Sequence, residues 1–264
     1  MSKDQRRQVA IVVSFLITLA INIAANALPI NGQRTAEISD RFDVFVIPAG
    51  YVFSIWGLIY LLLAAFTIYQ ARPSRSTDPT LRRLGWLPVV AGILNATWVL
   101  LFQYEWFSVT VPVMIGLLIT LVWINASTFA DRGRLVGSAR WTVRLPFSVY
   151  LGWITIATIA NIAQALQAVG VTVDPALAPI IAAGVLSIGL AIAVIFVWRF
   201  ADVAYGAVVV WAYIGVAVKE ADTALVAGAA LGGAGLVAGL ALWTIVARRA
   251  PSASTMVGVK HFGA

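Results

Sequence analysis

Long apolar runs separated by short polar segments make up most of the chain from one end to the other. A helix needs about 20 mostly apolar residues to cross the hydrocarbon core of a bilayer, because its backbone polar groups must be paired within the segment. Eight runs come close to that length, and little of the chain is left for a separate soluble domain. The pattern predicts an all-α integral membrane protein with eight transmembrane helices, over residues 8–28, 50–70, 84–104, 109–129, 143–166, 177–198, 203–218 and 224–247.

The distribution of charge tests this count independently, since Lys and Arg collect in the cytoplasmic loops of membrane proteins. With the N-terminus inside, only Arg34, Arg41 and Lys219 of the 18 basic residues fall in the outer segments. If one span had been counted wrongly, the basic residues would be spread over loops on both sides of the membrane. The sequence therefore predicts a multi-pass protein of the cell membrane with both termini in the cytoplasm.

The composition excludes most classes of soluble protein. The chain has 264 residues, of which 61% are hydrophobic and 11% are charged, and its mean hydropathy is +0.92. The net charge of +7 lies in short loops beside the spans, which indicates a lipid bilayer as partner and no nucleic acid. The chain has no cysteine, which excludes disulfides and thiolate metal sites, and its single histidine, His261, lies in the C-terminal tail.

The first span has two interpretations. A basic segment, an apolar stretch and then Ala25-Asn26-Ala27 are typical of a signal peptide with its cleavage site. Cleavage would leave seven spans in the same orientation, so the charge pattern does not distinguish the two. The length of the apolar run favours a retained helix.

Ionisable residues are absent from the middle of the spans, where they would mark ion pathways or proton relays. Glu105, Asp202, Lys219 and Glu220 all fall at predicted span ends. A retinal-type photoreceptor and proton-coupled transport are therefore disfavoured. No general acid, general base or metal site is visible, so catalysis would have to be photochemical or carried by aromatic side chains.

Aromatic and amide side chains, by contrast, do lie inside the spans. Asn95 and Trp98 are three residues apart, and Trp153, Ala157 and Asn161 are four apart, so each set shares one helix face. An amide in a membrane helix usually faces another helix or a cavity, and a buried indole N–H needs a partner. Such faces suit a flat, mostly apolar ligand, and plain helix packing is the alternative.

Three stretches resemble the tryptophan-rich sensory protein family, also called the translocator protein (TspO/MBR) family. They are PAGYVFSIWGLIY at residues 48–60, LNATWVLLF at 94–102 and WITIATIAN at 153–161. Their order and placement agree with the second, third and fifth helices of the family. The chain departs from the pattern at Tyr51, where the family has Trp, in the shorter spacing from Phe53 to Trp56, and at Pro146.

This resemblance implies a five-helix bundle over residues 1–168, followed by a three-helix extension at 169–250 and a cytoplasmic tail at 251–264. Family members are commonly dimeric and bind porphyrins in a pocket capped by the loop between the first two helices, here residues 29–49. No cofactor is required beyond a tetrapyrrole ligand. The residues that match the family pocket are Trp56, Tyr60, Asn95, Trp98, Phe102, Trp153 and Ala157, with Asn161 at its edge or in helix packing.

The last span carries its own motif, Gly228-xxx-Gly232 and Gly235-xxx-Gly239. Small residues at this spacing let membrane helices approach closely. We expect this stripe to dock on the chain's own bundle, and a homodimer face is the alternative.

Three functions stay open at this point. The first is a binding or sensory protein for tetrapyrroles or similar flat hydrophobic ligands. The second is a transporter of such a ligand, although neither inverted repeats nor paired broken helices are visible. The third is a light-dependent porphyrin-degrading enzyme in which tryptophans act as redox partners.

Overall fold

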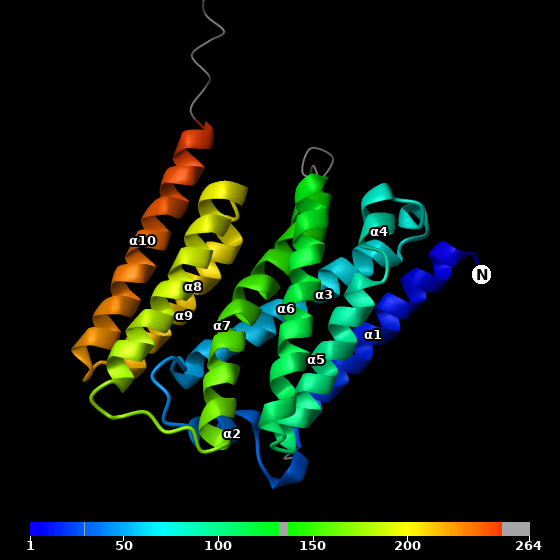
Figure 1. The fold of residues 1–264 in the computed structure, drawn as a ribbon. Coiled ribbons are helices and arrows are strands. Elements are labelled where there is room, and N and C mark those ends of the chain that lie inside the picture. Colours follow the sequence, from blue (N-terminus) through cyan, green and yellow to red (C-terminus); the bar gives the residue numbers. More distant parts are fainter. Residues whose placement is uncertain (29, 132–136, 250–264) are drawn as a thin grey trace, which may run out of the picture.

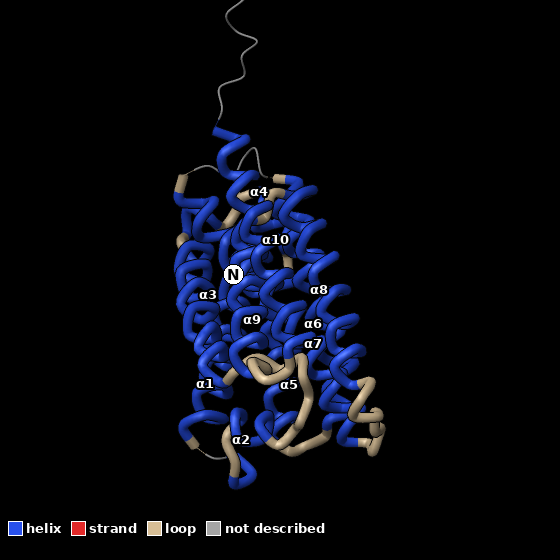
Figure 2. The backbone as a smooth tube through the Cα atoms, turned by 90° about the vertical axis from the view of Figure 1, so that its left-hand side faces the viewer, coloured by secondary structure: helices blue, strands red, loops and turns tan. Residues whose placement is uncertain are grey.

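The computed structural model describes residues 1–28, 30–131 and 137–249, and the predicted tail at 251–264 lies outside this part. Within it, every regular element is a helix, and the long helices run between two ends of one bundle (Figures 1 and 2). The long helices are α1 (Lys3–Ala27), α3 (Ile55–Ala71), α5 (Leu87–Gln103), α6 (Phe107–Ala130), α7 (Leu145–Ala168), α8 (Ala178–Phe200), α9 (Val203–Lys219) and α10 (Ala224–Arg249). The short elements are α2 (Thr35–Asp40), α4 (Pro79–Leu84), the 3₁₀ turns Ile30–Gly32, Gly50–Ser54 and Pro73–Arg75, and a π-helical turn at Arg140–Arg144.

The long helices coincide with the eight predicted apolar runs. Six of them are long and apolar enough to cross a bilayer when α3 is taken together with the 3₁₀ turn Gly50–Ser54 before it. The other two, α5 and α9, are apolar helices of 17 residues each. That length is at the lower limit of about 17 to 25 residues for a span. The protein is thus an integral membrane protein built of helices, and the count of eight spans stays a prediction.

The start of the third predicted span differs from the sequence interpretation. Residue 84 belongs to α4, which ends at Gly85 with a positive φ of 55°. The chain turns there, and α5 begins at Leu87 with Pro88 in its first turn, where a missing backbone N–H costs no helical hydrogen bond. The Gly85 turn therefore separates a short surface helix from the membrane helix.

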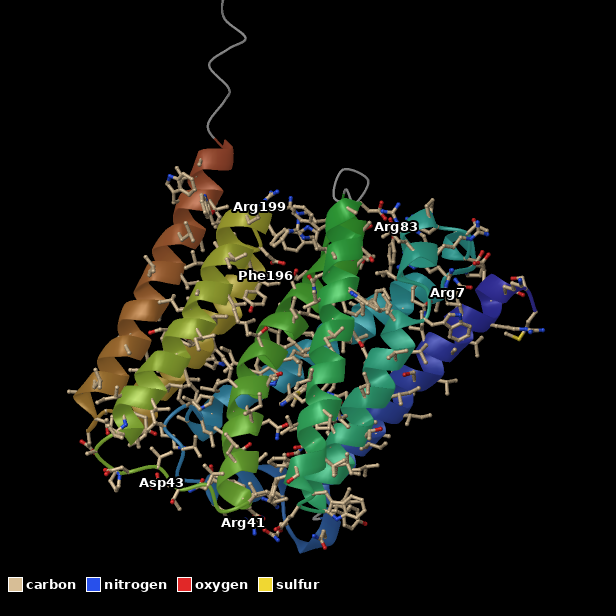
Figure 3. The ribbon with its side chains drawn as sticks, in the orientation of Figure 1. Arg7, Arg41, Asp43, Arg83, Phe196 and Arg199 are labelled. Atoms are coloured by element: carbon tan, nitrogen blue, oxygen red, sulfur yellow. The ribbon has the colours of Figure 1, made fainter. Side chains whose placement is uncertain are left out.

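The labelled charged residues fall at the two ends that the loop pattern predicts. Arg7, Arg83 and Arg199 lie toward one end of the bundle, and Arg41 and Asp43 lie at the other (Figure 3). This separation agrees with the alternation of inner and outer loops. Arg132, Arg134 and Lys260, which the same prediction places inside, lie outside the described residues.

Helix α7 forms the centre of the bundle. Of its most apolar stretch, 72% is buried, against 28 to 39% for the other span-length helices. Helix α9 packs closely on it, since a methyl group on Gly152 would lie 3.0 Å from Cβ of Val208 and 3.1 Å from the carbonyl oxygen of Tyr205. The Tyr205 hydroxyl donates to Oγ1 of Thr155 at 3.0 Å. The last three helices are thus joined to the first five through α9.

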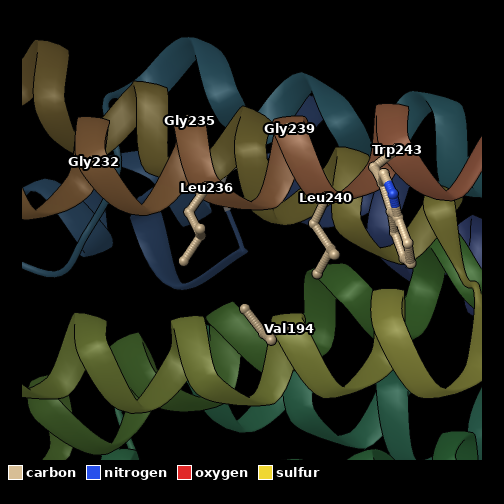
Figure 4. A pocket seen from close by; sticks show the side chains of 7 residues that line it. All are labelled: Val194, Gly232, Gly235, Leu236, Gly239, Leu240 and Trp243. Atoms are coloured by element: carbon tan, nitrogen blue, oxygen red, sulfur yellow. The ribbon is translucent and has the colours of Figure 1, made fainter.

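The glycine stripe of α10 is not packed against the chain, and the expectation that it docks on its own bundle is wrong. Gly228, Gly232, Gly235 and Gly239 are exposed, and a methyl group on any of them would meet no atom within 4 Å. Three of them border a groove of about 680 Å³ between α8 and α10, which Figure 4 shows with Val194 on its far side. The opposite face of α10 packs instead, through residues such as Val226, Ala230, Gly233, Ala234 and Val237. A dimer through the stripe stays a prediction.

Candidate functional site

A cluster of aromatic rings joins α3 to α7. The indole of Trp153 is 2% exposed and meets Phe53 and Trp56 edge to face, with ring centroids 5.5 and 6.1 Å away. Trp56 also stacks on Tyr60 at 5.6 Å and meets Tyr150 at 6.0 Å. Three of the predicted site residues, Trp56, Tyr60 and Trp153, therefore lie together.

The shorter spacing between Phe53 and Trp56 does not separate these rings. Phe53 lies in the 3₁₀ turn Gly50–Ser54, and Trp56 lies in the first turn of α3. Both rings contact Trp153. A 3₁₀ turn winds more tightly than an α-helix, so it directs Phe53 toward α7 with fewer intervening residues.

A second group lies further along α7, between α5, α6 and α7. Trp98 and Phe102 stack at 5.0 Å, and Nε1 of Trp98 donates to Oδ1 of Asn161 at 3.2 Å. Nδ2 of Asn161 donates to Oγ1 of Thr110 at 2.8 Å. Asn161 is 1% exposed, and both ends of its amide are used in bonds between helices.

The eight predicted residues therefore fall into more than one group. Trp153 and Asn161 are eight residues apart on α7, which corresponds to about 12 Å along the helix axis. Ala157 lies between them and is half-buried against the core. Within the described residues, no ring contact joins Trp153 or Trp56 to Trp98.

Asn95 connects the aromatic cluster to α1. Its Oδ1 accepts from Nδ2 of Asn22 at 2.8 Å, and its side chain is fully buried beside the Tyr150 hydroxyl. Tyr150 precedes Trp153 by three residues and so shares its helix face, a spacing from which the sequence could have identified it. Sequence reasoning singled out Asn95 and Trp153 but missed Tyr150.

Three buried polar atoms in this region have no hydrogen-bond partner: the Tyr60 hydroxyl, Nδ2 of Asn95 and Nε1 of Trp153. Trp56 contacts the rings of Tyr60 and Trp153 directly, and Tyr150 lies between Trp56 and Asn95. Buried polar groups are nearly always paired, and leaving one unpaired costs about 1 to 3 kcal/mol. The cluster thus offers two or more unused hydrogen-bonding groups next to aromatic faces.

The space beside the cluster is small. A cavity of about 40 Å³ lies between α1, α3, α5 and α7 and is lined in part by Thr18, Phe66, Gly92, Phe147 and Tyr150. It can hold a water molecule, whereas pockets for small-molecule ligands usually enclose about 300 to 1,000 Å³. In this conformation the rings pack against one another, so a flat ligand must separate them to enter.

The loop between α1 and α3, which is the predicted cap, is tied to the ends of α5 and α7. Gln103, the last residue of α5, is fully buried, and its Nε2 donates to the carbonyl oxygen of Gln33 at 2.9 Å. Its Oε1 accepts from the Thr35 hydroxyl at 3.0 Å. Nε2 of Gln164 on α7 donates to Oγ of Ser39 at 3.0 Å. Of the predicted loop 29–49, residue 29 lies outside the described residues.

The fold and these contacts define a helical membrane protein with a closely packed aromatic cluster between α3 and α7. The family model for TSPO-like proteins matches residues 8–243 of the chain. The protein therefore belongs to the TSPO-like family, as the three sequence motifs predicted. No curated protein and no solved structure matches the chain.

The family match continues beyond residue 168. It takes in α8, α9 and most of α10 in addition to the first five long helices. The division into a five-helix part and a three-helix part stays a prediction.

Proposed function

We propose that the protein binds a flat, mostly apolar ligand of the tetrapyrrole class in the aromatic cluster between α3, α5 and α7, and that it acts as a binding or sensory protein. The observation that carries this proposal is the set of unpaired polar atoms on Tyr60, Asn95 and Trp153, gathered around buried rings. A porphyrin offers a broad apolar face for the rings and polar groups for these atoms. No metal or other cofactor is needed.

The closed conformation makes binding a two-step event. Separating Phe53, Trp56 and Trp153 exposes apolar surface, and ligand binding then restores the buried contacts and pairs the polar atoms. The affinity that is measured is the affinity of the open state multiplied by the population of that state. We expect slow, saturable binding with an apparent affinity weaker than the contact area alone would give.

The direct test is a titration of detergent-purified protein with protoporphyrin IX, followed by quenching of tryptophan fluorescence. Trp153→Phe keeps an aromatic ring and removes the N–H group, whereas Trp153→Ala removes both. We expect a weakening of about 3- to 10-fold for the first and about 10- to 100-fold for the second, corresponding to about 1 and 2 kcal/mol.

The matched control is Trp243→Phe on α10, because that indole is 58% exposed and lies in no ring contact within the described residues. It should leave the affinity unchanged. Equal affinities for wild type, Trp153→Ala and Trp243→Phe would overturn the proposed site. An absence of saturable quenching by the wild-type protein would overturn the proposed ligand class.

The hydrogen bonds at the capped end favour binding over transport. A transported ligand must leave at both faces of the membrane, but Gln103 and Gln164 hold the loop over one end of the bundle. Proteoliposomes loaded with protoporphyrin IX should therefore release it no faster than protein-free liposomes. Protein-dependent release would favour the transporter, and loss of bound porphyrin under light would favour the enzyme.

We further propose eight spans with both termini in the cytoplasm. The chain has no cysteine, so single cysteines can report the topology. Ser138 and Asp174 are exposed and lie between long helices, on the predicted inner and outer sides. An impermeant maleimide should label Asp174→Cys in intact cells and Ser138→Cys only after permeabilisation, and the reverse result would contradict the orientation.

A further inference from the structure

The segment that leads into α3 rests on α9, a helix of the last third of the chain. The backbone N–H of Ala49 donates to the carbonyl oxygen of Gly215 at 3.1 Å. Nε1 of Trp211 donates to the carbonyl oxygen of Val52 at 3.2 Å, and its ring meets Tyr51 edge to face at 5.3 Å. Three contacts thus hold this segment against one face of α9.

Gly215 allows the segment to approach closely. A methyl group in its place would overlap Cγ2 of Val52 and lie 3.1 Å from Cβ of Pro48. Val52 is fully buried and branched at Cβ, and the Pro48 ring is rigid, so neither side chain can move aside without a shift of the backbone. The backbone position of residues 48–52 is therefore set by α9.

The same segment carries the first ring of the aromatic cluster. Phe53 follows Val52 directly in the 3₁₀ turn and contacts Trp153, and Trp56 lies one turn further along. A shift of Val52 must move Phe53, because the two residues belong to one hydrogen-bonded turn.

Helix α9 also holds the opposite side of the cluster. Asp202, which caps the N-terminus of α9, accepts from the Ser148 hydroxyl at 2.7 Å, and Tyr205 of α9 donates to Thr155 at 3.0 Å. Ser148 and Thr155 flank Trp153 on α7. One helix therefore contacts both of the elements between which Phe53 and Trp56 meet Trp153.

The carboxyl groups of Glu220, at the C-terminal end of α9, and of Asp43 give further support for the contact between α9 and the segment before α3. Burial raises the pKa of the Glu220 carboxyl, while Lys219 lowers it and Asp43 raises it. Asp43 belongs to the loop that leads to the segment at residues 48–52. The loop at Asp43 therefore passes near the C-terminal end of α9.

We propose that α9 is a positioning element for the aromatic site, and that Trp211 and Gly215 set the separation between Phe53 and Trp153 and with it the affinity for a flat ligand. This inference rests on the proposed function for its ligand, but not for the contact itself. Within the described residues, no hydrogen bond or ring contact joins Trp211 or Gly215 to the rings of the cluster. They act through Val52, and a change in the last three helices would reach the site along this connection.

The chain offers a matched pair of substitutions for the test. Gly215→Ala forces the overlap with Val52, whereas Gly228→Ala adds the same methyl group to α10 where no atom lies within 4 Å. Both substitutions replace a helical glycine by alanine, so both raise the helix propensity by the same amount. We expect Gly215→Ala to raise the Kd for protoporphyrin IX by about 3- to 30-fold and Gly228→Ala to change it by less than about 2-fold.

A second readout reports the position of the segment without any ligand. Ser54 is exposed at the end of the 3₁₀ turn, and in this cysteine-free chain a Ser54→Cys variant carries one label site. Gly215→Ala should change the rate of its reaction with a maleimide, and Gly228→Ala should not. Trp211→Phe, which keeps the ring contact with Tyr51 and loses the bond to Val52, should change both readouts in the same direction by a smaller factor.

The outcomes separate the two proposals. If the wild-type protein does not bind protoporphyrin IX, the proposed function fails, and the labelling rates still decide whether α9 positions the segment. If Gly215→Ala and Trp211→Phe match Gly228→Ala in labelling and in affinity, the positioning role is overturned. If Gly215→Ala does not fold, as judged by far-UV circular dichroism, Trp211→Phe alone decides the question.

Discussion

The bond between Trp98 and Asn161 allows one prediction to be worked out in detail. Asn161→Ala removes the acceptor of the Trp98 indole N–H and the donor to Thr110, two hydrogen bonds between helices. Hydrogen bonds inside membrane proteins contribute about 0.6 kcal/mol on average and at most about 1.7 kcal/mol. The buried indole N–H is also left unpaired, which raises the cost of the substitution. We expect the free energy of unfolding to fall by about 1 to 3 kcal/mol.

The assay is equilibrium unfolding in mixed micelles with increasing sodium dodecyl sulfate, followed by far-UV circular dichroism. A double-mutant cycle with Trp98→Phe isolates the shared bond, because the doubly substituted protein has neither donor nor acceptor. The coupling energy should be about 1 kcal/mol. Asn26→Ala is the control and should cost less than about 0.5 kcal/mol. That amide is exposed, and among the described residues it bonds only to the carbonyl oxygen of Asn22 in its own helix.

The same variant also tests the role of Asn161 in ligand binding. Because Asn161 lies about two turns from Trp153 and already uses its amide in helix packing, Asn161→Ala should leave the affinity for protoporphyrin IX within about 2-fold of wild type. The packing argument would be refuted if the losses of stability caused by Asn161→Ala and by Trp98→Phe add up, within about 0.3 kcal/mol, to the loss in the double variant. A large loss of affinity in folded Asn161→Ala would place this residue in the pocket.

Three further substitutions have expected outcomes. Gly152→Ala should lower the melting temperature, because the added methyl group would press on α9. Gly184→Ala should not lower it, since no atom lies within 4 Å of its added methyl group. Equal melting temperatures would contradict the close packing of α7 and α9. Gln103→Ala should speed proteolysis within the loop after α1, because the bonds that hold the loop are lost; an unchanged cleavage rate would show that the loop is held by other contacts. Arg83→Gln should destabilise the protein, because it leaves the buried carboxylate of Asp131 without its partner at 3.0 Å. The loss should be only about 1 kcal/mol, since Arg83 itself is half exposed. Adding Asp131→Asn should restore stability in the same unfolding assay.

The helices were predictable because each membrane helix pairs its own backbone groups, so hydropathy and length alone locate it. The segment before α5 was assigned less well. The sequence interpretation extended the third span to residue 84, and the turn at Gly85 separates that residue from the span. A positive φ at a single glycine determines this boundary, and hydropathy averaged along the chain does not detect it.

Which faces of the helices are buried was much less predictable. Trp123 and Trp153 both lie within apolar spans, yet Trp123 is 61% exposed and Trp153 is 2% exposed. The lipid-facing side of a membrane helix is as apolar as the packed side, so the contrast that marks a buried face in a soluble protein is missing. For the same reason the glycine spacing of α10 wrongly predicted packing on the bundle, while no motif in the sequence marks Gly152 and Gly215, which do permit close contact.

The sequence by itself determined the membrane class, the apolar helices, the family and three rings of the aromatic cluster, Trp56, Tyr60 and Trp153, because these depend on local composition and on spacing along one helix. Only the tertiary structure decided that Trp56 and Trp153 pack together while Asn161 belongs to a separate network, and that Trp211 bonds to Val52 across 159 positions of the chain. Such contacts depend on how whole helices are placed against one another. No pattern within a single segment specifies that placement.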